Sequence, residues 1–150
     1  MSEHKQRLPR IALAVFVLLT ASAVGAFFGW VGGSMYVEKP EHAWLAPLGM
    51  AVGLAGGCIT ACLWLMAMFH EMSKPQPELI IRRGIVFGML AGLLTATFLH
   101  TALIAVTHMI HMIRMAATCI VLAGVPAGFL VGLAGGLAAW AVVKWGQRHG

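Results

Sequence analysis

The sequence predicts an all-α, polytopic membrane protein: a four-helix transmembrane bundle with glycine-zipper packing. Of its 150 residues, 60% are hydrophobic and 10% are charged, whereas a soluble domain carries about 25% charged residues. The apolar residues form four long runs, each of at least the roughly 20 residues that cross a bilayer core as a helix. Glycine recurs at every fourth position within these runs. Membrane strands would show ~10-residue segments of alternating polarity, and the sequence has none.

The first predicted span covers residues 11–31 and follows a basic segment at residues 5–10. The same arrangement fits a cleaved secretory signal peptide, because Ala21-Ser22-Ala23 supplies the small residues of a cleavage site. The apolar run continues beyond Ala23 to Val31, however, and so reaches spanning length. We therefore expect an uncleaved first span, with cleavage after Ala23 as the alternative.

The other three predicted spans cover residues 45–69, 84–107 and 116–143. Pro126 falls inside the fourth of these, where a missing N–H and a bulky ring should kink the helix. The four spans leave too little chain for a soluble domain. Residues 1–150 are therefore expected to form a single four-span transmembrane domain.

The glycine series predicts how these helices meet. Residues four apart lie nearly above one another on a helix, so each span has a strip without side chains. Lipid tails are as apolar as leucine, and helices in a bilayer therefore associate through close backbone approach, which small residues permit. We expect a helix-packing role for the strips; the alternative is that they line a pore or a ligand groove. Thirteen of the 18 glycines belong to the series: Gly25, Gly29 and Gly33; Gly49, Gly53 and Gly57; Gly84, Gly88 and Gly92; and Gly124, Gly128, Gly132 and Gly136.

The net charge of +5 is unevenly distributed. Eight of the ten Lys and Arg residues lie near the N-terminus, between the second and third spans, or near the C-terminus, which is one side of a four-span topology. Only Lys39 and Arg114 lie on the other side. Because cytoplasmic loops are enriched in Lys and Arg, a multi-pass protein with both termini in the cytoplasm is expected. No dedicated basic patch is present, so nucleic acid is not an expected partner.

Polar side chains gather on one side of the third span. Thr97, His100 and Thr101 lie within about 60° of one line along this helix, and Thr107, His108 and His111 continue that line. Polar residues inside a span are candidates for function, and histidine with methionine suits copper and similar metals. We expect no resident cofactor and regard the outer part of this stripe as an interfacial segment. The alternative is a copper or zinc site formed by His42, His100, His108 and His111.

The sequence shows no arrangement of residues typical of an enzyme. The spans contain no carboxylate, and the chain has no nucleophile elbow and no phosphate loop. We therefore expect a non-enzymatic membrane protein that acts as a packing or association subunit. Its partners would be the lipid bilayer and either further copies of itself, as a homo-oligomer, or another subunit of a membrane complex. The alternative is a transporter or channel for a metal ion or small solute that uses the polar stripe of the third span.

Overall fold

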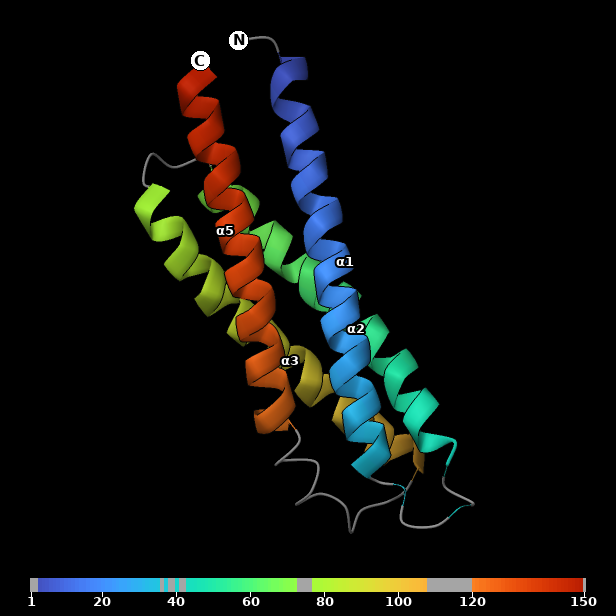
Figure 1. Cartoon of the computed structure of the whole chain (residues 1–150). Helices are drawn as coiled ribbons and strands as arrows, with labels where there is room; N and C mark the ends of the chain where they lie inside the picture. Colours follow the sequence, from blue (N-terminus) through green and yellow to red (C-terminus); the bar gives the residue numbers. More distant parts are fainter. Residues whose placement is uncertain are drawn as a thin grey trace.

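The computed structural model describes residues 3–35, 37, 40, 43–72, 77–107 and 120–149. The elements that it places are all helical: α1 (Glu3–Met35), α2 (Leu45–Glu71), α3 (Pro77–Thr107), a short π-helix η3 (Ile120–Gly124) and α5 (Val125–His149). Figure 1 shows that α1 begins and α5 ends at the same end of the bundle, here called the terminal end. At the opposite end, α1 is followed by α2, and α3 is followed by η3.

Four of the described helices are long and apolar enough to cross a membrane. Their apolar parts are Pro9–Met35, Leu45–Glu71, Leu79–Thr101 and Val121–Gln147. Within an apolar 18-residue stretch of each, only 17% to 33% is buried. Large apolar side chains therefore cover the outside of the bundle, as they do in a multi-pass membrane protein. The helices extend beyond the predicted spans, and α1 begins at Glu3, eight residues before residue 11.

The four long helices form two antiparallel hairpins. In the first hairpin α1 packs along α2, and in the second α3 packs along α5, and these two pairs have the most extensive contacts. The hairpins meet through smaller contacts of α1 with α5 and of α2 with α3. Each helix thus has one close partner from its own hairpin and one looser partner from the other.

Within each hairpin the two backbones approach one another at glycine. A Cβ atom added at Gly53 would overlap the carbonyl oxygen of Gly25 and would lie 2.8 Å from the Cα of Gly29. In the second hairpin, a Cβ atom added at Gly88 would lie 2.5 Å from the Cα of Gly132. Real Cβ atoms are essentially never found within 3.0 Å of such atoms, so a larger residue at these positions requires the helices to move apart.

The buried apolar core occupies the terminal half and the middle of the bundle. Its largest members, Trp64 and Met68 of α2, Val17 of α1 and Ile80 of α3, are at most 2% exposed. They pack with small residues such as Ala139 of α5. All four long helices therefore contribute to one core on the terminal side. In the opposite half of the bundle a pocket lies between the hairpins.

The fourth predicted span is not α-helical throughout its described part. The described part of this span begins with the π-helical turn η3, and the α-helix starts only at Val125. Pro126 is thus the second residue of α5 and follows η3 directly. A π-helical turn and a proline are both common causes of a bend in a helix, and here they lie side by side.

Candidate functional site: a pocket between the two hairpins

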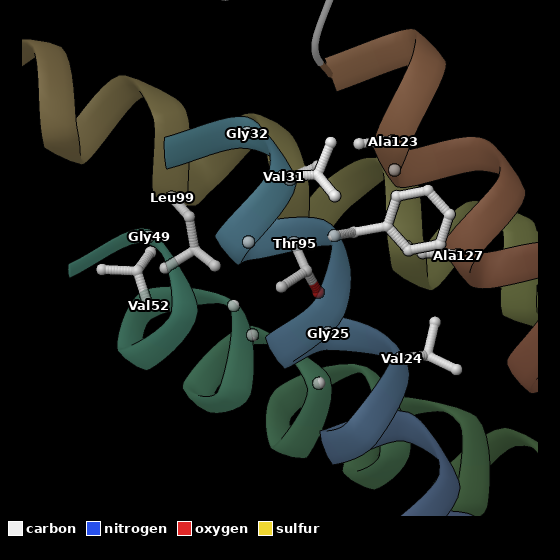
Figure 2. A pocket seen from close by; sticks show the side chains of 18 of the residues that line it. Val24, Gly25, Val31, Gly32, Gly49, Val52, Thr95, Leu99, Ala123 and Ala127 are labelled. Atoms are coloured by element: carbon white, nitrogen blue, oxygen red, sulfur yellow. The ribbon is translucent and has the colours of Figure 1, made fainter. Parts of the chain in front are cut away.

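A pocket of about 450 Å³ lies between the two hairpins in the half of the bundle away from the termini. It is lined by residues within 21–35 of α1, 45–60 of α2, 92–100 of α3 and 122–131 of η3 and α5. Figure 2 shows that its walls come from all four long helices, with Val24 from α1, Val52 from α2, Leu99 from α3 and Ala127 from α5. Its volume lies within the roughly 300–1,000 Å³ that small-molecule sites occupy.

The glycine strips open this space. A glycine strip lets two helices touch, but it also leaves the flanks of the interface without side chains that could fill the centre of the bundle. Gly25 and Gly53 of the first hairpin and Gly92 and Gly128 of the second all line the pocket. Gly56 of α2 lies beside them, and a Cβ atom added there would come within 2.5 Å of a methyl carbon of Leu99.

A threonine pair forms part of the pocket wall. Thr60 of α2 donates a hydrogen bond to the Thr95 hydroxyl of α3 over 3.0 Å. The two residues are 6% and 7% exposed. The bond crosses from one hairpin to the other and satisfies polar groups that burial would otherwise penalise.

His100 of α3 is the other polar side chain of the pocket. It is half-buried, and its Nδ1 lies 2.8 Å from the carbonyl oxygen of Ala96. Because a carbonyl oxygen only accepts hydrogen bonds, Nδ1 carries the proton, and in the neutral ring Nε2 is then an acceptor. The lining residues that the structure describes include no Asp, Glu, Lys or Arg.

The polar stripe predicted for the third span divides between two surfaces. His100 lines the pocket, whereas Thr97 and Thr101 are exposed on the outside of the bundle. Their hydroxyls donate to the carbonyl oxygens of Leu93 and Thr97, each over 2.8 Å. A hydrogen bond to its own helix satisfies the hydroxyl of a threonine on the outside of the bundle. Thr97 and Thr101 therefore provide no polar lining for a path through the bundle.

The predicted metal ligands can be placed only in part. His100 has the position given above, and His42, His108 and His111 lie outside the described residues. Among the residues that the structure does describe, no three His, Cys, Asp or Glu side chains lie together as a metal site would require.

All thirteen glycines of the predicted series contact the partner helix of their own hairpin. A Cβ atom added at any of them would lie 3.2 Å or less from an atom of that helix. The strips are thus occupied within the chain. The strip residues of the first hairpin are Gly25, Gly29, Gly33, Gly49, Gly53 and Gly57, and those of the second are Gly84, Gly88, Gly92, Gly124, Gly128, Gly132 and Gly136.

Sequence reasoning missed the residues that join one hairpin to the other. Trp64 is fully buried, and its indole N–H bonds to α3. A Cβ atom added at Gly135 of α5 would lie 2.8 Å from the Trp64 ring. The available signals were a tryptophan inside a span, where its N–H needs a partner, and the first glycine of each of the pairs Gly56-Gly57 and Gly135-Gly136, which lies outside the fourfold series.

Comparisons with protein-family models, with curated proteins and with solved structures found no match to this chain.

Proposed function

We propose that this chain is a four-span membrane protein that binds an apolar ligand in the pocket between its hairpins. The observation that carries the proposal is the pocket itself, about 450 Å³ with walls that are almost entirely apolar. Apolar walls without neighbours lose their dispersion contacts, and a water molecule needs two to four polar partners to be stable in a cavity. Thr60, Thr95 and His100 are too few to hold water throughout the pocket, so an apolar occupant suits it best.

The size of the pocket suits one lipid-like molecule. A cavity of roughly 150 Å³ lined by apolar side chains binds benzene, and this pocket is about three times as large. By that scale it has room for roughly 18 carbon atoms. A single long hydrocarbon chain or a small fused-ring compound has this size.

The framework around the pocket is held, in this proposal, by glycine-zipper packing in both hairpins. The overlap that a Cβ atom would make at Gly53 and at Gly88 supports this mechanism. Close backbone approach gives many dispersion contacts where the hydrophobic effect between helices is absent. The packing would keep each hairpin rigid, while the looser contacts between hairpins leave room for a ligand.

The proposed orientation places both termini in the cytoplasm. The supporting observation is that Arg10, Arg83 and Lys144 all belong to the terminal end, as the positive-inside bias requires. Lys144 also lies 4.3 Å from the ring centroid of Trp140. Trp30 and Trp44 are half-exposed at the opposite end. Tryptophan is enriched at both membrane surfaces, and the pocket would then lie in the outer leaflet.

Two functions expected from the sequence remain predictions. A role as an association subunit would need a surface other than the glycine strips, because those strips are occupied within the chain. A channel or transporter for a metal ion or polar solute would need polar walls, since a charged species is costly to bury without partners. Within the described part of the chain, three polar side chains line the pocket, and the apolar-ligand proposal therefore accounts best for its lining.

The proposal can be tested by titrating 1-hexadecanol into the detergent-solubilised protein and counting bound molecules by native mass spectrometry. We expect one bound molecule per chain. Val52→Trp, which fills the pocket, should abolish binding. Ala127→Leu, which adds less volume, should weaken it. Ala55→Trp is the matched control, because Ala55 lies on the same helix and is exposed outside the bundle. Equal binding by the wild-type protein and Val52→Trp would refute the proposal.

A further inference from the structure

The polar side chains of the pocket differ in what they offer a ligand. Among the described residues that line it, His100 supplies the one ring nitrogen, and it lies about 7.5 Å further along α3 than Thr95. Thr60 donates its hydroxyl proton to Thr95, and neither hydroxyl oxygen lacks a hydrogen-bond partner. A bound molecule therefore meets one polar position near His100 and hydrocarbon walls beyond it.

The pocket is also long. The α1 residues that line it extend from Ala21 to Met35, which corresponds to about 21 Å at 1.5 Å per residue. Ala21, Thr60 and Val131 lie at its deep end, near the core of the bundle. An extended chain fits this shape better than a compact ring system does.

The chemistry of His100 specifies the polar end of the ligand. Nδ1 donates to the carbonyl oxygen of Ala96. The other ring nitrogen, Nε2, is therefore able to accept a hydrogen bond in the neutral ring. Nothing in the described part of the chain donates to it. A ligand group that donates, such as a hydroxyl, complements this nitrogen. An ionised carboxylate or phosphate finds no cationic partner among the described lining residues, which include neither Lys nor Arg.

We propose that the ligand is a neutral long-chain molecule with a hydroxyl at one end, held by a hydrogen bond from that hydroxyl to Nε2 of His100. This inference rests on the proposed function, because it names the ligand class of the same pocket. The hydrocarbon chain fills the apolar remainder of the pocket.

The test compares 1-hexadecanol with hexadecyl methyl ether, whose oxygen accepts hydrogen bonds but cannot donate them. The wild-type protein should bind the alcohol roughly tenfold more tightly than the ether, the value of one hydrogen bond in a low-dielectric site. His100→Phe should reduce the affinity for the alcohol to that for the ether and leave the ether unchanged. Thr101→Val is the control, because Thr101 is the next residue along α3, is exposed on the outside of the bundle and bonds to its own helix. It should preserve the preference.

The outcomes separate this inference from the proposed function. If the wild-type protein binds both probes equally and Val52→Trp loses both, the pocket binds apolar molecules and the hydroxyl inference is wrong. If neither probe binds, both the inference and the proposed function are wrong. The comparison of the two probes on the wild-type protein needs no variant, so it remains decisive even if His100→Phe fails to fold.

Discussion

The indole N–H of Trp64 in α2 donates a buried hydrogen bond to the carbonyl oxygen of Gly84 in α3, over 2.8 Å. This bond joins the two hairpins on the terminal side of the pocket. Gly84 also belongs to the glycine strip of the second hairpin, where an added Cβ atom would lie 2.9 Å from the Cα of Gly136. Gly84, which belongs to α3, is thus in contact with both α2 and α5. The hairpins are therefore tied together at this end, and the pocket opens between them beyond it.

We predict that Trp64→Phe destabilises the bundle by about 1–3 kcal/mol, because it removes the indole hydrogen bond and leaves part of the Trp64 volume empty. Trp30→Phe is the matched control, since Trp30 is 50% exposed and faces the surroundings of the bundle. Thermal unfolding in detergent, followed by circular dichroism, measures both. Equal transition temperatures for the two variants would contradict the role assigned to Trp64.

We predict that Gly53→Ala destabilises the first hairpin, whereas Gly32→Ala does not. The added methyl at Gly53 overlaps the backbone of α1, and such overpacking costs about 1–3 kcal/mol. Gly32 has open space where its Cβ would lie, so alanine should be neutral there or stabilise the helix by up to about 1 kcal/mol. Chemical denaturation of both variants in one detergent makes the comparison. Equal losses at the two positions would show that close backbone contact is not what the strip provides.

The Thr60–Thr95 bond should contribute little to stability by itself. Hydrogen bonds between membrane helices average about 0.6 kcal/mol, with a maximum near 1.7 kcal/mol. We therefore expect a coupling free energy in this range from a double-mutant cycle of Thr60→Val and Thr95→Val, measured by denaturation in detergent. A coupling near zero would mean that the two hydroxyls do not stabilise one another across the hairpins.

We predict the membrane topology that fusions to a reporter of cytoplasmic or external location should reveal. Fusions after residue 72 and after residue 147 should report the cytoplasm, because the basic residues concentrate at that end of the bundle. A fusion after residue 37 should report the external side. An external signal from the fusion after residue 147 would contradict the four-span arrangement with both termini inside.

Much of the fold follows from spacing along single helices. Four apolar runs predict four long helices, and the structure confirms four helices of spanning length. A four-residue period predicts one glycine-lined face per helix, and in the structure Gly25 and Gly53 meet on such faces. These features depend only on the geometry of one helix and on the chain order of the hairpins, and both can be read directly from the sequence.

The pocket could not be predicted in the same way, because it depends on how one hairpin sits against the other. The third-span stripe illustrates this. Thr97, His100 and Thr101 cover about 100° of the helix surface, an arc wide enough to include both the pocket wall and the lipid-facing side. Only the packing of α2 and α5 against α3 decides that His100 lines the pocket and that the two threonines do not.

The central claim is that an apolar ligand binds between the hairpins and not on the outer surface of the bundle. The most direct measurement uses a long-chain alcohol with a photoactivatable diazirine at the middle of its chain, and mass spectrometry then identifies the labelled residues. Labelling that excess 1-hexadecanol displaces should fall on pocket residues such as Val52, Leu99 and Ala127. If the displaceable labelling instead falls on exposed residues such as Leu94 and Phe98, the pocket is not the binding site and the account is wrong.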